Sequence, residues 1–229
     1  MKKLNWIILI LTIIFISSCD KEDISKMIQE DEPVIDIDEN TYKTVKIGEQ
    51  IWMAENLRVT RFNDGTEIPQ LIDVDDWKNS NLMGYCWYNN DKTYSDSYGA
   101  IYNGRTIKSD KLCPTGWHIP TLEEWQTLID YAGGDSIAGL SLKEQGNEHW
   151  TTFNKNVNNK YGFTALPGGY RDIYGEFKGI NHLGIWWTST NEDSTPLLWF
   201  ISISRYFENV DKASFGQVSD GYSVRCVKD

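Results

Sequence analysis

One stretch of this chain has the pattern of a long helix, while the rest of its globular part has the pattern of short strands. Thr121 and Glu124 form a T-x-x-E capping box, the usual start of a helix. Apolar residues then recur on one helical face, at Leu122, Trp125, Leu128, Ile129 and Ala132. Two glycines at 133–134 favour a left-handed helix end. We therefore expect one dominant helix at about 121–132, with a shorter one at 137–144.

Short apolar runs separated by turn residues predict strands elsewhere. Residues 42–47 and 51–56 flank Gly48-Glu49-Gln50 and predict a hairpin, and residues 58–62 run into a strong Asn-Asp-Gly turn signal. The best later strands are 184–190, 198–204 and 221–228. Trp186 and Trp187 are adjacent on a strand, so they point to opposite faces, and we expect one in the core and the other open to exposure. The pattern predicts one α+β domain at 42–229, with one dominant helix, short strands and long loops.

The N-terminus has the organisation of an export signal. Lys2 and Lys3 precede a nearly unbroken apolar run of 13 residues from Leu4 to Ile16, too short for a membrane-spanning helix of about 20 residues. Ile16-Ser17-Ser18-Cys19 then resembles a lipobox. We expect a lipoprotein signal peptide at 1–18 and a mature chain that starts at lipid-modified Cys19, anchored to a membrane by its acyl chains. An ordinary signal peptide followed by a chance cysteine is the alternative.

Residues 19–41 are expected to form an acidic tether. From Asp20 to Asn40 the chain holds nine acids and two lysines, without an amphipathic period. The first four of these residues resemble the lysine-and-acid signal that sends some Bacteroidetes lipoproteins to the outer face of the outer membrane, although a plain solvated linker fits equally well. The whole chain has a formal charge of −11. Such a charge repels nucleic acid, so we expect no nucleic-acid partner.

The cysteines and histidines do not predict a metal centre. Besides Cys19 the chain has Cys86, Cys113 and Cys226, so one disulfide and one free thiol is the simplest account in an oxidising compartment, with three possible pairings. There is no C-x-x-C, and the three histidines lie far apart in sequence. Acids at 191–193 and at 73–76 could supply oxygen ligands to calcium, but solvated loop acids are the usual case. We expect no metal and no cofactor.

Several separated blocks resemble one known family. They include LCPTGWHIPTLEEW from residue 112, YGFTALPGGYRDIYGEF from 161, GIWWTST from 184 and GYSVRCV from 221. Together with YKTVKIGEQIWMAENL, GYCWYNND and YGAIYNGR in the first half, they resemble the Fibrobacter succinogenes major paralogous domain over residues 42–229. The resemblance implies an α+β, C-type-lectin-like fold of small twisted antiparallel sheets with one dominant helix and long loops. Such a scaffold displays loops and pairs its N- and C-terminal strands. It also implies a Cys113–Cys226 disulfide, because that scaffold brings the first helix against the last strand. The rival pairing is Cys86–Cys113.

The sequence does not favour an enzyme. Formylglycine-generating enzymes, which the phrase HIPTLEEW also resembles, need two cysteines near the C-terminus, whereas only Cys226 lies in the last hundred residues. Glycoside hydrolysis needs two carboxylates across a cleft, and acids are too common here to identify a pair. G-x-S-x-G and H-E-x-x-H are absent from the sequence. We expect no catalytic residues, and a carbohydrate-active or sulfatase-modifying-like enzyme is the less favoured alternative.

Aromatic rings beside hydrogen-bonding side chains favour a recognition role instead. A sugar packs its C–H face on an aromatic ring, while carboxylates and amides form hydrogen bonds with its hydroxyls. Two predicted loops offer this mixture, at Trp87, Tyr88, Asn89 and Asp91 and at Tyr170, Arg171 and Asp172. We expect a glycan or protein ligand at the cell surface, on the outer membrane. The alternative is a structural or matrix protein without a small ligand, in which the rings brace long loops.

Overall fold

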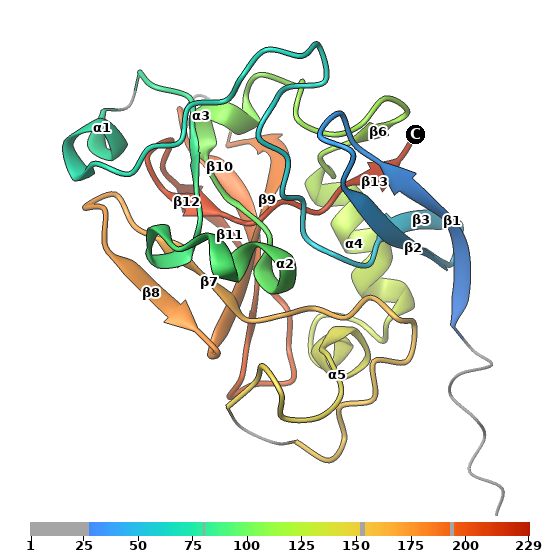
Figure 1. The fold of residues 1–229 in the computed structure, drawn as a ribbon. Helices are drawn as coiled ribbons and strands as arrows, with labels where there is room; N and C mark the ends of the chain where they lie inside the picture. The colour runs from blue at the N-terminus through green and yellow to red at the C-terminus, as the bar shows by residue number, and fades with distance from the viewer. Residues whose placement is uncertain (1–27, 80, 152–153, 193–194) are drawn as a thin grey trace, which may run out of the picture.

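The first sheet joins the two ends of the domain. The computed structural model describes residues 28–79, 81–151, 154–192 and 195–229 (Figure 1). Five strands form this sheet in the order β1-β2-β3-β13-β6, with bounds Gln29–Ile35, Thr41–Ile47, Gln50–Met53, Val227–Lys228 and Trp117–His118. Val227 pairs with Trp52 on one side and His118 on the other. The predicted hairpin at 42–56 is therefore present, and it lies beside the closing strand as expected.

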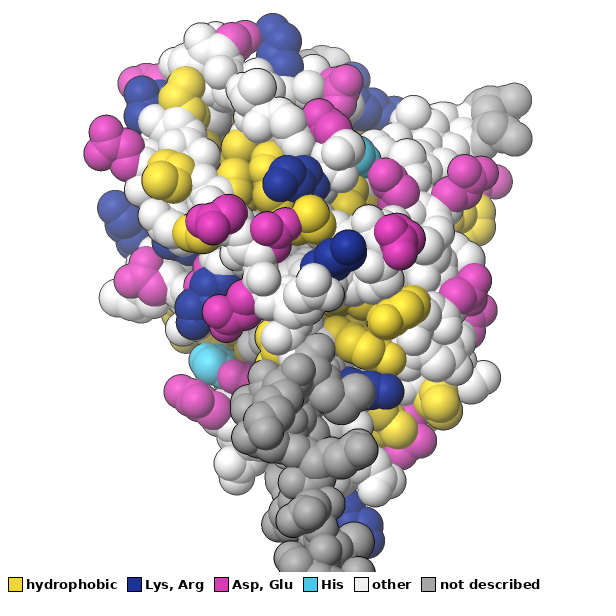
Figure 2. Space-filling view, turned by 90° about the vertical axis from the view of Figure 1, so that its right-hand side faces the viewer, with side chains coloured by type: hydrophobic (Ala, Val, Ile, Leu, Met, Phe, Trp, Pro, Cys, Tyr) yellow, Lys and Arg dark blue, Asp and Glu magenta, His cyan; other side chains and the backbone are white. Residues whose placement is uncertain are grey.

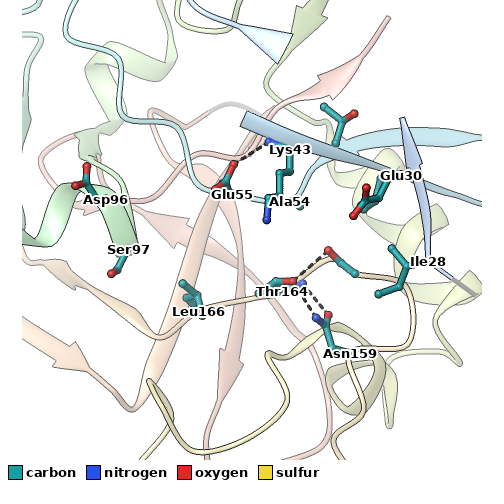
Figure 3. A pocket seen from close by; sticks show the side chains of 13 residues that line it. Ile28, Glu30, Lys43, Ala54, Glu55, Asp96, Ser97, Asn159, Thr164 and Leu166 are labelled. Atoms are coloured by element: carbon teal, nitrogen blue, oxygen red, sulfur yellow. Dashed lines mark hydrogen bonds between the residues drawn. The ribbon is translucent and has the colours of Figure 1, made fainter. Parts of the chain in front are cut away.

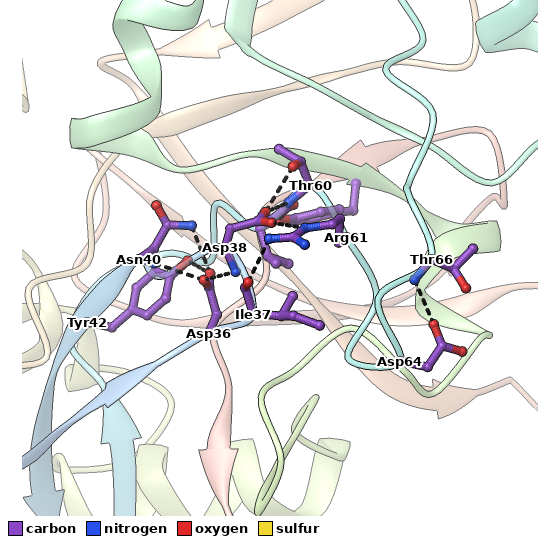
Figure 4. A network of polar contacts seen from close by, with 11 residues as sticks. Asp36, Ile37, Asp38, Asn40, Tyr42, Thr60, Arg61, Asp64 and Thr66 are labelled. Atoms are coloured by element: carbon purple, nitrogen blue, oxygen red, sulfur yellow. Dashed lines mark hydrogen bonds and ion pairs between the residues drawn. The ribbon is translucent and has the colours of Figure 1, made fainter.

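β1 corrects the predicted extent of the tether. Gln29–Ile35 pairs antiparallel with β2, with Glu30 opposite Val45, so part of the segment expected as a tether belongs to the first sheet. The loop after β1 is fixed by two carboxylates (Figure 4). Asp36 accepts hydrogen bonds from the Tyr42 hydroxyl at 2.6 Å and from the Asn40 side chain at 2.9 Å. Asp38 accepts from the Arg61 guanidinium and the Thr60 hydroxyl.

Two further sheets form the other side of the molecule. The second has the order β4-β5-β12-β7-β8, with bounds Tyr85–Cys86, Ile101–Asn103, Gly221–Tyr222, Gly168–Arg171 and Phe177–Ile180. The third has the order β11-β10-β9, with bounds Asp211–Gly216, Leu198–Ser204 and Leu183–Asn191. The strand predicted at 221–228 is thus split into β12 and β13, which belong to different sheets. The strand predicted at 58–62 is not formed, and of its residues Arg61 alone makes a bridge, with Glu67.

The described helices of this α+β chain are few and short. The dominant helix α4 spans Leu122–Tyr131, and its capping box at Thr121 and Glu124 is complete, as predicted. α5 covers Ala138–Leu142. The remaining elements are single turns: α1 (Val74–Lys78), η2 (Tyr88–Asn90), η3 (Lys92–Tyr94), α2 (Ser95–Tyr98) and α3 (Gly104–Ile107). Within the described residues, no helix is long and apolar enough to cross a membrane.

The two adjacent tryptophans on β9 are both fully buried, which corrects the expectation that one might be exposed. Trp186 lies near Trp125 of α4, with ring centroids 6.1 Å apart. Trp187 points to the opposite face and packs on Tyr222 at 4.2 Å. Both have 0% exposure because β9 is covered on one side by helix α4 and on the other by the second sheet. β9, an edge strand of the third sheet, therefore lies between two apolar clusters.

A disulfide and a buried arginine tie the last residues of the chain to its middle. Cys113 and Cys226 are bonded, the pairing that the family resemblance implied, and Cys86 is a buried free thiol. Arg225 is 1% exposed and donates to the side-chain oxygen of Asn56 and to the backbone oxygen of Phe163. Its guanidinium also lies 4.3 Å from the Phe163 ring. The closing segment is thus held by covalent, polar and aromatic contacts at once.

Candidate ligand-binding hollow

The first predicted contact loop turns its rings into the core. Trp87 is 5% exposed and meets the Tyr85 ring edge-on at 5.2 Å. Tyr88 is 6% exposed and packs on Tyr94 and Phe177. These two rings, expected at a ligand surface, have little surface left for a ligand.

The polar side chains predicted in that loop, Asn89 and Asp91, are exposed, and both residues belong to local turn structure. Asn89 has a positive φ of 52° inside the η2 turn, a conformation that asparagine tolerates well. Asp91 accepts hydrogen bonds from the backbone N–H and the hydroxyl of Thr93 at 2.9 and 2.8 Å, and these bonds keep the pKa of its carboxyl low. The loop therefore supplies exposed polar groups without an accompanying ring.

Arg171 and Asp172 in the second predicted loop are also structural. Arg171 is 1% exposed and donates to the backbone oxygens of Leu71 and Ile72 at 2.6 and 3.1 Å. Its guanidinium stacks on the Trp77 ring at 4.5 Å. Asp172 pairs with Lys178 at 2.6 Å. Burial would raise the pKa of this carboxyl, but its hydrogen bonds outweigh burial and lower it.

Tyr170, the ring predicted in the second loop, lines a surface hollow. The space has a volume of about 370 Å³ and is formed by β7, β9, β10 and β11 with the residues around β12. We call it the aromatic hollow, and it is lined by Tyr170, Ile173, Leu183, Ile185, Phe200, Ser202, Phe215, Gln217, Asp220 and Tyr222. Tyr170 meets Tyr222 at 6.1 Å, Tyr222 meets Phe200 at 5.0 Å, and Phe200 meets Phe215 at 5.1 Å. Four rings thus follow one another across the hollow.

Polar groups line the hollow together with these rings. Asp220 accepts the backbone N–H of Gln217 at 2.9 Å, and its carboxylate interacts with the Tyr222 hydroxyl. Burial raises the pKa of the Asp220 carboxyl, and it also raises the pKa of Tyr222. Ser202 and Gln217 add a hydroxyl and an amide. Rings beside a carboxylate, an amide and hydroxyls are the usual composition of a small-ligand site.

Sequence reasoning missed most of this site. Tyr222 belongs to the strand predicted at 221–228, but its neighbours in space, Tyr170 and Phe200, come from distant segments. Phe215 is 67% exposed although it lies on a strand, and a phenylalanine so exposed is the strongest marker of the hollow's rim. Asp220 gave no signal, because acids are common throughout this chain.

A second hollow of about 290 Å³ lies between β1–β3 and the segment at 159–166 (Figure 3). Two pairs of its polar groups are hydrogen-bonded to one another. Glu55 accepts the backbone N–H of Lys43 at 2.7 Å, and Asn159 bonds with Thr164 at 2.8 and 2.9 Å. It contains no aromatic ring among its lining residues, so it is a weaker candidate for a ring-shaped ligand.

Among the described residues, two groups that could hold a cation already make contacts within the protein. Glu144, Glu148 and His149 place possible ligand atoms within 4.8 Å of one another, but His149 Nδ1 already lies 2.8 Å from a Glu144 oxygen. Asp73, in an acidic loop considered for calcium, caps α1 through the backbone N–H of Asp75. Asp193, in the other such loop, lies outside the described residues, as does the predicted lipidation site Cys19.

Charge is dispersed on the face that carries the N-terminal hairpin. Figure 2 shows acidic side chains scattered over this face, with basic side chains and small apolar areas between them. Although the net charge is −11, the acidic side chains visible on this face do not form one continuous patch that would attract a strongly charged partner. On this face, recognition would depend on local contacts instead of long-range attraction.

Comparison with known proteins gives a family but no characterised relative. No curated protein matches the chain, and no solved structure does. The sequence family called the Fibrobacter succinogenes major domain matches residues 45–228, which include all the strands that line the aromatic hollow. This match covers most of the chain. The protein therefore belongs to the Fibrobacter succinogenes major domain family.

Proposed function

We propose that this protein is a cell-envelope lipoprotein that displays a non-catalytic recognition domain and binds a glycan in the aromatic hollow. The observation that carries the proposal is the row of four rings beside Asp220, Gln217 and Ser202. Sugar rings stack their C–H faces on aromatic side chains, and their hydroxyls need neighbouring polar groups. The antiparallel sheets, short helices and paired terminal strands are compatible with the C-type-lectin-like fold group, which we propose as the wider relationship.

The composition of the hollow supports binding without catalysis. Of the residues that line it, Asp220 alone carries a carboxylate. Hydrolysis of a glycosidic bond generally uses two carboxyl groups, one as acid and one as base or nucleophile. A single half-buried carboxylate suits the fixing of a ligand hydroxyl or amine.

A glycan array with the mature chain, expressed without its lipid, tests the binding proposal. Wild type should bind a defined set of glycans. Phe215→Ala should lose most of that binding with an unchanged melting temperature, because the ring is largely exposed. Phe207→Ala is the matched control, since Phe207 is 61% exposed and does not line the hollow. Equal binding by both variants, or no bound glycan at all, would contradict the proposal.

The lipid anchor at Cys19 on the outer membrane is a separate part of the proposal. It rests on the order of the charged start, apolar run and cysteine at the N-terminus. Wild type should fractionate with outer membranes and be digested by protease added to intact cells. Cys19→Ala should remain uncleaved or be released in soluble form. A Cys19→Ala protein that fractionates as wild type does would refute the anchor.

The competing function is a structural protein of the cell surface without a small ligand. The inward-facing rings of Trp87 and Tyr88 favour it, because they brace loops as this alternative requires. The partly exposed Tyr170 and the exposed Phe215 favour a ligand instead. The array distinguishes the two, since a structural protein has no reason to select among glycans.

A further inference from the structure

The four rings of the aromatic hollow meet at steep angles. The ring planes of Tyr170 and Tyr222 are inclined by 68°, those of Tyr222 and Phe200 by 54°, and those of Phe200 and Phe215 by 87°. Rings set at these angles do not form one flat stacking surface, which needs coplanar rings. Tyr222 and Phe200 are nearly buried and lie deep, while Tyr170 is half-buried and Phe215 is exposed at the edge. Ring faces with several orientations around one small space attract a cation more strongly than one face does.

Among the described residues, the Asp220 carboxylate forms no ion pair with a lysine, arginine or histidine. The groups with the largest effects on this carboxylate are the backbone N–H groups of Gln217 and Ile173, the Tyr222 hydroxyl and the carboxylate of Asp172. None of these is a cation, and Asp172 is itself paired with Lys178. A half-buried carboxylate is costly without an opposite charge, which is why burial raises its pKa. A positively charged ligand group would supply the missing partner.

We infer that the aromatic hollow selects a sugar that carries a positively charged amino group, with the ammonium held between the rings and Asp220. The inference rests on the proposed glycan-binding function and adds the chemical class of the ligand. The sugar ring lies against Tyr170 and Phe215 at the rim. Its hydroxyls reach Gln217 and Ser202, and its ammonium donates to Asp220.

Three tetrasaccharides with the same β-1,4 linkage test this selection by isothermal titration calorimetry with the mature, lipid-free chain. They are the tetramers of glucosamine, of N-acetylglucosamine and of glucose, used at a pH where the glucosamine amine is protonated. The glucosamine tetramer should bind at least tenfold more tightly than the other two. Asp220→Asn keeps an acceptor for the Gln217 N–H and removes the charge, so it should abolish that preference while neutral sugars still bind. Its melting temperature checks that the variant is folded.

The outcomes separate this inference from the proposed function. Equal binding of the three tetramers, or a preference that persists in Asp220→Asn, overturns the amino-sugar inference and leaves glycan binding in place. Glycan-array binding restricted to sugars without amines does the same. No binding to any tetramer or array glycan overturns both. A trilysine peptide that binds more tightly than the glucosamine tetramer would also overturn the inference, since the partner would then be a protein.

Discussion

The side chain of Asn56 joins three segments that are distant in sequence. Asn56 is 4% exposed, and its oxygen accepts hydrogen bonds from Trp186 Nε1 at 2.8 Å and from Arg225 Nη2 at 3.0 Å. Its amide nitrogen donates to the backbone oxygen of Tyr98 at 2.9 Å. The Arg225 guanidinium donates to the side-chain oxygen of Asn56 and to the backbone oxygens of Phe163 and Thr164, which are all neutral acceptors. Asn56→Ala therefore removes the central acceptor of a buried charged group.

The expected loss of unfolding free energy follows from the groups left without partners. A buried donor or acceptor without a hydrogen bond costs about 1–3 kcal/mol, and the cost is larger for a charged group. Trp186, Arg225 and the Tyr98 carbonyl each lose a partner, although Arg225 keeps its bond to Phe163. We expect a loss of about 3–5 kcal/mol. For a domain of this size, that corresponds to about 6–20 °C in melting temperature.

Asn56→Asp is the matched control for size. Aspartate retains an acceptor for Trp186 and Arg225 and adds a negative charge beside the guanidinium, while it loses the donor to Tyr98. We expect it to remain within about 2 kcal/mol of wild type. Urea denaturation followed by tryptophan fluorescence measures both variants. A cost below about 1 kcal/mol for Asn56→Ala, or a larger cost for Asn56→Asp than for Asn56→Ala, would refute the reasoning.

Three further predictions concern stability. Trp87→Ala should lower the unfolding free energy by about 3–5 kcal/mol, because its ring is core, while Phe215→Ala should change it by less than about 0.5 kcal/mol; equal effects in urea denaturation would contradict this. Removing both Cys113 and Cys226 opens a loop of 113 residues and should cost at most about 4.7 kcal/mol, and peptide mapping of wild type should find these two linked. Burial lowers the pKa of His118, but its hydrogen bonds to two carboxylates outweigh burial and raise it. Its stabilising effect is therefore full below its unfolded pKa of about 6.5 and is lost as pH rises through the folded pKa. We expect His118→Gln to lower the unfolding free energy by less than about 1 kcal/mol, because the ion pairs of His118 are partly exposed. This difference from wild type should shrink from pH 5 to pH 9.

Local signals predicted the parts of the fold that local contacts stabilise. The capping box places the start of α4 because Thr121 and Glu124 bond to each other's backbone within one turn. The hairpin of β2 and β3 likewise depends on a turn between neighbouring segments. The Cys113–Cys226 bond came from family resemblance, since nothing local distinguishes it from the other pairings.

The parts that were missed depend on contacts between distant segments. β1 is acidic and lacks alternation, and it becomes a strand because β2 offers an edge and because Asp36 and Asp38 fix the loop that follows. The segment at 58–62 stays irregular since Thr60 and Arg61 bond to Asp38. These partners cannot be seen in a local pattern.

The same limit applies to the candidate site. Composition showed where aromatic residues are abundant, but the direction of a ring depends on the strands packed around it. Trp87 was expected outward and points inward, while Tyr170 reaches the surface. The other rings of the hollow come from β10, β11 and β12, and their proximity follows from a topology that joins strands of two sheets.

The position of β1 determines how the domain responds to mechanical load. When the chain is held at its N-terminal side, tension enters at Gln29, the outer end of an edge strand. An antiparallel strand pulled from its end separates one hydrogen-bond pair at a time, like a zipper, which needs less force than shearing all pairs together. The seven residues of β1 release about 20–25 Å of chain. Unzipping then meets Asp36 and Asp38, whose bonds to Tyr42 and Arg61 hold the loop. Under such a pull we therefore expect β1 to detach from β2 before the core is strained.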